Sequence, residues 1–266
     1  MEISNITKEY LAKIFSENKR FDGRKLLDFR DIELTYDVSN KAEGSARVKF
    51  GNAELVVGIK LAPGESYPDS PGQGNLICSG ELLPLASSKF ESGPPAFKAI
   101  ELGRLVDRAI RESGMIDFSK LAIDDKKVWC IYVDIYPIND NGNLIDIATI
   151  GALAALKNAK MPSIDKEGNV DYSVKKGSLP LSKEISPISL SFFKLGDSII
   201  LDPTLEEEEA SEARITFGVS KWNKQHMINS CQKAGKLPFS QEEISKIMTI
   251  LPQKFDELSE KLKKFL

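Results

Sequence analysis

The chain has 266 residues, of which 41% are hydrophobic and 28% are charged. This length and balance are typical of a folded body with a substantial core and exclude a mainly disordered chain. No apolar run is long enough to cross a bilayer, and the first residues lack the basic and apolar regions of a secretion signal, so we expect a cytoplasmic protein without a membrane partner.

The formal net charge of −3 gives no overall attraction to nucleic acid, so any contact with nucleic acid must come from a local group of Lys and Arg side chains. The three cysteines lie far apart in the sequence, and there is a single histidine. These residues predict neither a disulfide framework nor a zinc site. We therefore predict no metal site and no cofactor.

Apolar spacing in the first part of the chain predicts two kinds of element. Residues 3–17 have helical spacing and predict a short helix that serves as a packing arm. Alternating apolar residues predict strands, with a tight hairpin turn at Gly51-Asn52. These strands are expected at 32–34, 46–50, 55–61, 75–83 and 128–138. Helices are expected over 98–112 and about 145–157, and the second is apolar nearly all round and should be buried.

The segment 162–186 has prolines, glycines and charges without apolar periodicity, which indicates a join between two halves. Strand patterns then resume at 188–195, 198–201, 214–219 and 226–231. Ser240 and Glu243 form a capping-box signal for a terminal helix, in which Pro252 should cause a kink. Because both halves run from hairpin strands to helices, we predict an α+β body of two related sheet-and-helix layers.

Three arginines, Arg104, Arg108 and Arg111, follow one another at helical spacing of four and three residues. On a helix this spacing places them on one face, opposite the apolar residues, as a cationic stripe. The alternative is a solvated face held by ion pairs, because acidic residues lie three or four positions away. Those residues are Glu101, Asp107 and Glu112.

Two further segments contain polar groups that could bind an ion or act in catalysis. Asp202 is followed by the acidic run 206–209, which could hold a divalent cation or supply a general acid, or could be a solvated loop. The segment 139–143 joins a strand to a helix, whose free N-terminal N–H groups could bind an anion, although a plain turn explains it equally well.

Several motifs together resemble the RNase PH family, and within it most closely the non-catalytic ring subunit of the archaeal exosome. The resemblance extends over roughly residues 18–230. It rests on Arg20–Arg24, the segment 43–51, Glu81-Leu82-Leu83-Pro84-Leu85-Ala86, the segment 90–95 and the helix 99–111.

The resemblance implies a fold of duplicated βαβ-type, S5-like halves packed as one compact body. We expect a helical arm at 1–18, an N-terminal half at 19–161, a connecting segment at 162–186 and a C-terminal half at 187–266. Family members form six-membered rings in which active and inactive subunits alternate. The active subunits degrade RNA from its 3′ end with phosphate. The expected partners are a catalytic RNase PH-type subunit in three heterodimers, RNA-binding cap proteins and single-stranded RNA.

The resemblance also implies that this chain lacks catalytic residues. Phe97 and Lys98 stand where active members have an Arg-rich stretch, and 141–144 replaces a Gly-Gly-Thr-Arg loop that grips phosphate. Asp202 and Glu208 are degenerate counterparts of two aspartates.

A further aspartate of the active pattern is replaced by Arg214. Arg104 and Arg108 match arginines with which the inactive subunit contacts RNA in the neighbouring active site, and Lys98 and Arg111 are additional RNA-binding candidates. Two alternatives stay open. In one, Asp202 and Glu208 form a working phosphate-dependent 3′ to 5′ exoribonuclease site. In the other, the chain is a scaffold whose arginines make only ion pairs.

Overall fold

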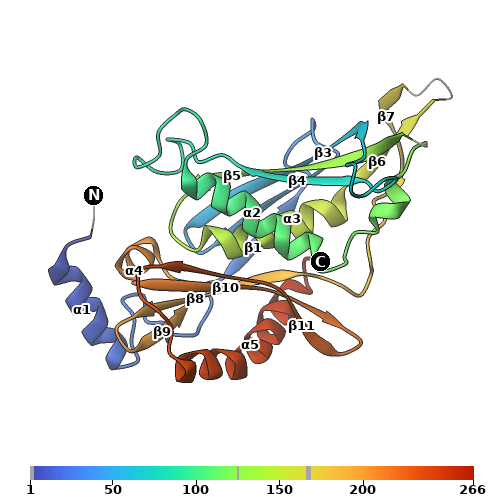
Figure 1. Cartoon of the computed structure of the whole chain (residues 1–266). Coiled ribbons are helices and arrows are strands. Elements are labelled where there is room, and N and C mark those ends of the chain that lie inside the picture. Colours follow the sequence, from blue (N-terminus) through green and yellow to red (C-terminus); the bar gives the residue numbers. More distant parts are fainter. Residues whose placement is uncertain (1–2, 125, 166–168) are drawn as a thin grey trace.

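The computed structural model describes residues 3–124, 126–165 and 169–266 (Figure 1). Its first part contains α1 (Asn5–Ser16), β1 (Ile32–Tyr36), β2 (Gly44–Phe50), β3 (Ala53–Glu65), β4 (Asn75–Gly80), α2 (Phe97–Arg111), the 3₁₀ turn η1 (Phe118–Leu121), β5 (Lys127–Asn139) and α3 (Leu144–Asn158). The remainder contains β6 (Lys160–Ile164), β7 (Val170–Ser178), β8 (Ile188–Leu195), β9 (Ser198–Leu201), α4 (Leu205–Ala210), β10 (Ala213–Trp222), β11 (Gln225–Gly235) and α5 (Gln241–Leu262).

The N-terminal sheet has the strand order β1-β2-β3-β5-β4, in which only the β4–β5 pair is parallel. The predicted hairpin turn joins β2 to β3, because Phe50 pairs with Ala53 across Gly51 and Asn52. Gly51 has φ +53°, a conformation that such a tight turn requires and that glycine adopts without steric cost. The alternating pattern of β3 buries one face of this sheet against α2 and α3.

The helix α3 lies between the two large sheets (Figure 1). Its residues from Ile145 to Leu156 are all buried, as the nearly uniform apolar sequence predicts. One side packs on β2 and β3, and another packs on β8. Burying an apolar side chain contributes about 2 kcal/mol, so this helix is a major source of the energy that joins the two halves.

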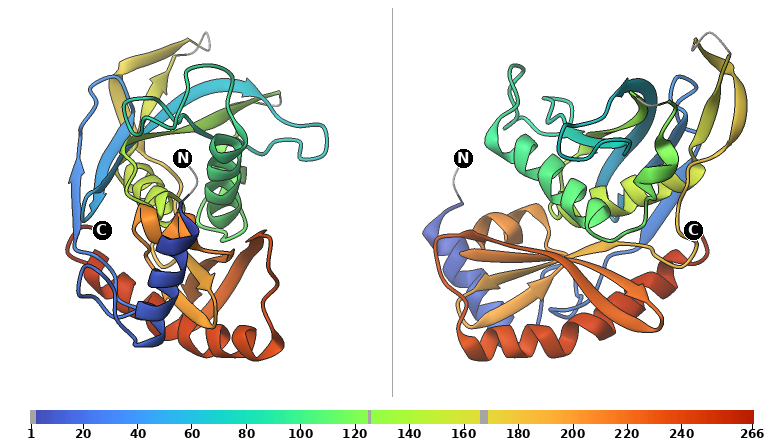
Figure 2. Two further views of the ribbon diagram at one scale, coloured as in Figure 1. Left: turned by 90° about the vertical axis from the view of Figure 1, so that its left-hand side faces the viewer. Right: turned by 45° about the vertical axis from the view of Figure 1, so that its right-hand side comes forward.

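The C-terminal sheet has the order β11-β10-β8-β9 and is antiparallel throughout. The terminal helix α5 covers its outer face with Ile247, Leu251, Phe255, Leu258 and Leu262. The predicted capping box between Ser240 and Glu243 is present. The helix continues through Pro252 without a break, and its axis changes direction along its length (Figure 2).

The helix α1 packs against the C-terminal half. Leu11 and Phe15 are buried against Phe193, Leu195 and Ile200. The segment 162–186, in contrast, contains most of a β6–β7 hairpin that stands away from the body (Figure 2). Nearly all of β7 is exposed. Its residues Val170, Tyr172 and Val174 alternate with polar residues, so the expectation that this segment lacks apolar periodicity is wrong for the strand. None of the helices in the described ranges is long and apolar enough to span a membrane.

Candidate nucleic-acid interface and the adjoining acidic site

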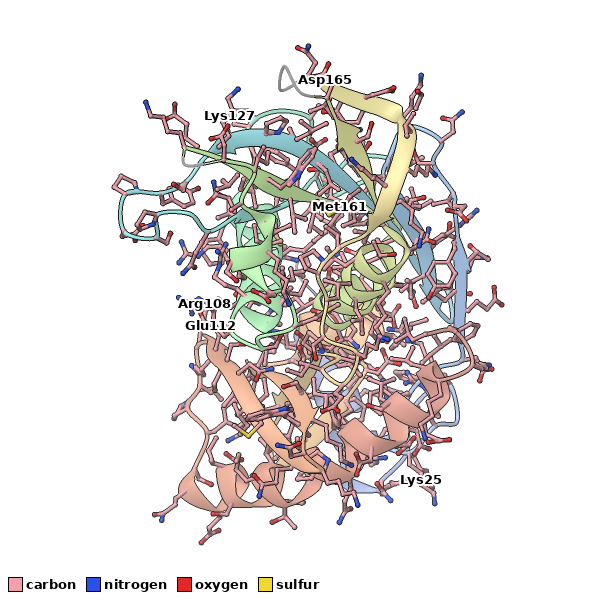
Figure 3. The ribbon with its side chains drawn as sticks, turned by 90° about the vertical axis from the view of Figure 1, so that its right-hand side faces the viewer. Lys25, Arg108, Glu112, Lys127, Met161 and Asp165 are labelled. Carbon is pink, nitrogen blue, oxygen red and sulfur yellow. The ribbon has the colours of Figure 1, made fainter. Side chains whose placement is uncertain are left out.

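The helix α2 has one buried and one solvent-exposed face. Leu102, Leu105, Val106 and Ala109 are buried against the neighbouring sheets. Because Arg104 and Arg108 are exposed, they belong to the outer face, and Figure 3 shows Arg108 at the edge of the molecule near the end of this helix. The strand β4 lies beside α2, and the carbonyl of its residue Leu76 accepts a hydrogen bond from Arg111.

The three arginines of α2 differ in their partners. Arg111 donates from Nε to Asp107 at 3.0 Å and from Nη2 to the carbonyl of Leu76 at 2.6 Å. Across residues 3–124, 126–165 and 169–266, neither Arg104 nor Arg108 makes a side-chain hydrogen bond or ion pair with another described residue. The ion-paired alternative therefore describes Arg111, whereas Arg104 and Arg108 present free guanidinium groups to solvent.

Lys98 is exposed near the start of α2. It lines a groove of about 570 Å³, whose walls are the segments 80–83 and 89–96. It also lines a smaller adjoining pocket of about 60 Å³ together with Asp140, Glu208 and Arg214. Lys98 thus belongs to the neighbourhood of the acidic residues as well as to α2.

The acidic run 206–209 forms the short helix α4, so the solvated-loop interpretation is wrong. Thr204 and Glu207 make a capping box at its start. Glu207 also forms a buried ion pair with Arg20, and Glu209 pairs with Lys89. Three carboxylates of the run, including Glu208, point to three different partners. In the part of the chain that the structure describes, no group of three or more acidic, Cys or His side chains could hold a metal ion.

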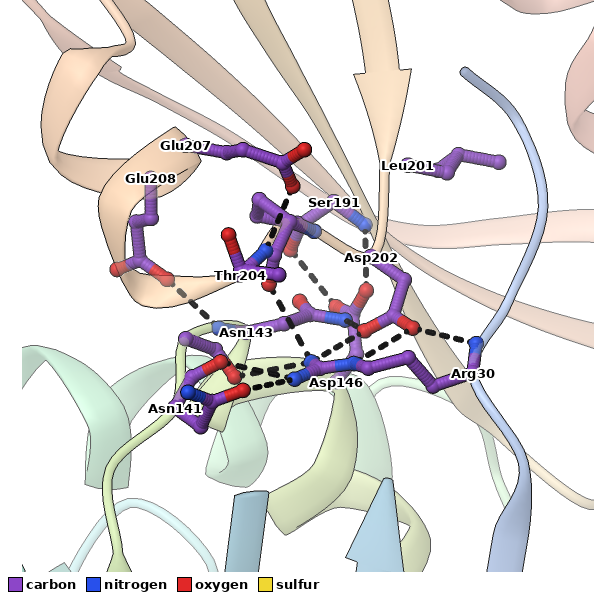
Figure 4. A network of polar contacts seen from close by, with 12 residues as sticks. Arg30, Asn141, Asn143, Asp146, Ser191, Leu201, Asp202, Thr204, Glu207 and Glu208 are labelled. Carbon is purple, nitrogen blue, oxygen red and sulfur yellow. Dashed lines mark hydrogen bonds and ion pairs between the residues drawn. The ribbon is translucent and has the colours of Figure 1, made fainter. Parts of the chain in front are cut away.

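Glu208 occupies the N-terminus of α3. Its Oε2 accepts a hydrogen bond from the backbone N–H of Asn143 at 2.6 Å (Figure 4). Asn143 is the N-cap and has φ +60°, and the preceding Gly142 packs so closely on α4 that a Cβ would lie 2.6 Å from the carbonyl carbon of Thr204. Burial raises the pKa of Glu208; the Asn143 hydrogen bond opposes this rise, and the charge of Asp140 adds to it. The predicted anion position is thus filled by a carboxylate of the chain itself.

Asp202 lies on the other side of Asn143 and is completely buried. Its Oδ1 accepts from Arg30 Nη2 at 2.6 Å and from Asn143 Nδ2 at 2.9 Å. Its Oδ2 accepts from the Arg30 backbone N–H at 2.7 Å and from Arg24 Nη1 at 3.1 Å. Burial alone would raise the pKa of Asp202, but the hydrogen bonds and charge of Arg30 outweigh it, and the pKa is lowered. The side chain is a stably ionised centre of a network that joins the chain's two halves.

Asp146, in the first turn of α3, is a second fully buried carboxyl group. Its oxygens accept from the backbone N–H of Ser191 at 3.0 Å and from Ser191 Oγ at 2.7 Å (Figure 4). Burial without a paired cation raises its pKa to about 7; the Ser191 hydrogen bonds oppose the rise, and the charge of Asp202 adds to it. This group is a proton-binding site beneath the network.

The partners of Asp202 could not be identified from the sequence. Arg30 lies 172 residues away along the chain and belongs to no recognisable local pattern. Arg20 and Arg24 are in a segment that supports the family resemblance, but their spacing does not indicate what they bind. Glu101 and Arg214, which are paired at 2.6 Å, are likewise separated by 113 residues.

Two family models match the chain: the 3′ exoribonuclease family, domain 1, over residues 28–162, and domain 2 of the same family over residues 186–250. The Exosome complex component Rrp42 of Methanocella arvoryzae is 42% identical over 261 residues, which cover 98% of this chain and 96% of that protein. The solved Archaeoglobus fulgidus exosome with RNA bound to the active site contains a chain with 37% identity and a TM-score of 0.87, covering 97% of this chain and 98% of that one.

An archaeal exosome core contains another similar chain, with 34% identity, a TM-score of 0.83 and 97% of each chain covered. These matches confirm the predicted α+β RNase PH fold. The chain belongs to the 3′ exoribonuclease family, also called the RNase PH family.

Proposed function

We propose that this chain is a non-catalytic subunit of an archaeal-type exosome. In this proposal it pairs with a catalytic RNase PH-type subunit, and three such heterodimers form a ring that degrades single-stranded RNA from the 3′ end with phosphate. The relatives named as exosome components and the similar exosome structures support this assignment. Cap proteins with RNA-binding domains, a cytoplasmic location and the division at 1–18, 19–161, 162–186 and 187–266 are parts of the same proposal.

The observation that carries the RNA-binding role is the state of Arg104 and Arg108. Both are exposed and have no partner among the residues that the structure describes. A guanidinium that is free of internal ion pairs can contact a phosphate without first breaking a bond to the protein. Lys98 and Arg111 are secondary candidates, because Lys98 faces the acidic pocket and Arg111 already binds Asp107.

The engagement of the two degenerate carboxylates supports the absence of catalysis. A general acid must reach the leaving group of the substrate. Asp202 has no exposed surface and is held ionised by Arg30, whereas Glu208 is bound to the N-terminus of α3. Arg214, where active members have a further aspartate, is paired with Glu101. Asp202 and Arg214 are thus held in internal ion pairs, and one oxygen of Glu208 is held by the backbone.

The RNA-binding role is tested in the ring assembled with its catalytic sister, in phosphate-free buffer so that RNA is not consumed. The double variant Arg104→Ala/Arg108→Ala should bind RNA more weakly than wild type. If each arginine neutralises one phosphate, the slope of log affinity against log salt concentration should become less steep by about 1.4. Lys236→Ala/Lys246→Ala removes the same charge from exposed positions outside α2 and serves as the control. Unchanged binding by the α2 variant across the salt series would favour the scaffold alternative.

The enzymatic alternative requires a separate assay. The purified chain without its sister is incubated with phosphate and 5′-labelled RNA, and the products are separated by length. We expect no progressive shortening. Shortening by this chain that depends on phosphate and is lost in Asp202→Asn, at a temperature at which circular dichroism shows that the variant is still folded, would show that the site is active after all.

A further inference from the structure

Arg104 has a carboxylate three residues away on either side, Glu101 and Asp107. Side chains at this spacing are neighbours on a helix surface, and oppositely charged pairs of this kind attract each other. From the sequence alone, both carboxylates compete with RNA phosphate for Arg104. In the structure neither of them bonds to Arg104.

Each carboxylate is held by a different arginine. Arg111, which lies on α2 itself, forms an ion pair with Asp107, and its Nη2 is 2.6 Å from Oδ1. Arg214, which lies on β10, forms an ion pair with Glu101, and its Nη2 is 2.6 Å from Oε1. Gln232 on β11 adds a longer hydrogen bond of 3.2 Å to the same oxygen. The Arg214 and Glu101 side chains are only 12% and 11% exposed, so this pair is sheltered from solvent.

We propose that Arg214 is a positioning residue for RNA binding: it draws Glu101 toward β10 and so leaves Arg104 free to contact phosphate. This inference rests on the RNA-binding role proposed for Arg104. It gives a function to the arginine that stands where catalytic family members have an aspartate. The same change that removes a carboxylate from the degenerate site supplies the cation that keeps the RNA-contacting helix face positive.

The competing pair sets the size of the effect. Loss of Arg214 leaves Glu101 with only a neutral partner, Gln232, in a sheltered place. An ionised carboxylate in such surroundings gains by turning toward the nearest exposed cation. A helix-surface ion pair shifts an equilibrium by about twofold, and the sheltered position of Glu101 increases this, so we expect RNA affinity to fall by about two- to fivefold at low salt.

The test uses the ring with its catalytic sister in phosphate-free buffer and measures binding of a labelled single-stranded RNA. Arg214→Met should lower affinity by about two- to fivefold and reduce the salt slope by up to about 0.7, since one phosphate contact is neutralised. Adding Glu101→Gln to Arg214→Met should restore the wild-type affinity, and Arg214→Lys should retain most of it. Lys221→Met is the matched control, because it removes another β10 cation whose carboxylate partner, Asp256, lies on α5.

The decisive measurement is made in the Arg104→Ala background, where Arg214→Met should have no further effect. An equal loss of affinity with and without Arg104, or no rescue by Glu101→Gln, would overturn the inference. Ring assembly of every variant is checked by native mass measurement, and Arg214→Gln replaces Arg214→Met if the latter does not assemble. If Arg104→Ala/Arg108→Ala itself leaves RNA binding unchanged, the proposed RNA-binding role of these arginines is wrong. If that variant weakens binding but Arg214→Met does not, only the positioning role of Arg214 is wrong.

Discussion

The carboxylate of Glu208 and the backbone N–H of Asn143 lie 2.6 Å apart, so a side chain of α4 closes the N-terminus of α3. A helix N-terminus attracts anions because its first N–H groups lack partners within the helix. Glu208 supplies this anion from within the chain and links the two halves at the same time. The bond therefore has a structural role at the position where, according to the family resemblance, this chain lacks the phosphate-gripping loop of active members.

Replacing Glu208→Ala should destabilise the fold by about 1 to 3 kcal/mol, because the change removes a charge-assisted hydrogen bond and leaves the Asn143 N–H without its partner. Urea denaturation of the isolated chain measures this loss. Glu206→Ala on the same helix is the control, since Glu206 is exposed and should change stability by less than about 0.5 kcal/mol. Equal effects of the two substitutions would contradict the role assigned to Glu208.

The Asp202 network predicts a larger effect. Asp202→Asn keeps the shape of the side chain and tolerates its φ of +46°, but it removes the negative charge that balances Arg30 and Arg24. Leaving a buried cation unpaired costs about 3 to 5 kcal/mol. The free energy of unfolding should fall by this amount at pH 7, whereas the exposed Asp197→Asn should be nearly neutral.

The lowered pKa of Asp202 gives the network a pH dependence with a definite sign. Its stabilising contribution is present above the unfolded pKa, near 4, and is lost as pH falls through the lower folded pKa. Asp202→Asn should therefore lose most of its disadvantage relative to wild type in strongly acidic solution. A difference that stays constant down to the lowest accessible pH would show that the charge of Asp202 does not contribute.

Arg111, the partnered arginine of the RNA-binding candidates, should differ from the free Arg104 in its contribution to stability. Arg111→Ala removes the ion pair with Asp107 and a hydrogen bond to the carbonyl of Leu76, so it should lower stability by about 1 kcal/mol. Arg104→Ala removes no described contact and should change stability by less than about 0.5 kcal/mol. Thermal unfolding of the isolated chain compares them directly; the opposite ranking would mean that the two arginines exchange roles in solution.

The spacing of apolar residues predicted those helices and strands that have one buried face and one solvent-exposed face. The stripe that buries Leu102 and Leu105 in α2 also places Arg104 and Arg108 outside, so the exposure of these two arginines could be predicted from spacing. Their RNA-binding role, in contrast, was implied by the family resemblance. The strand β7 lies inside the predicted connecting segment: Val170, Tyr172 and Val174 do alternate with polar residues, but the charges and glycines around them hide this short pattern. β4 ends at Gly80, three residues before the predicted limit at Leu83.

The internal partners of the charged residues could not be predicted, since they depend on tertiary folding. Local spacing suggested that Glu101 pairs within α2, but β10 places Arg214 beside it. In the same way the fold brings Arg30 to Asp202 and makes Glu208 the cap of α3. Helix spacing identifies which charges share a face, whereas packing between distant segments decides which of them stay free.

Asp146 predicts a pH dependence opposite in sign to that of Asp202. Its pKa is about 7 in the folded chain and near 4 when unfolded, so the folded state holds a proton that unfolding releases. The free energy of unfolding should therefore fall as pH rises from about 4 to 7, and the loss should be complete above pH 7.

Asp146→Asn mimics the protonated group, because its amide can donate to Ser191 Oγ while its oxygen accepts from the Ser191 N–H. The stability of this variant relative to wild type should rise by roughly 2 to 3 kcal/mol between pH 5 and pH 8. Urea denaturation across this range measures the difference, with Asp197→Asn as the control for loss of a carboxylate. If the difference between Asp146→Asn and wild type does not change with pH, Asp146 is ionised throughout and the buried proton is absent.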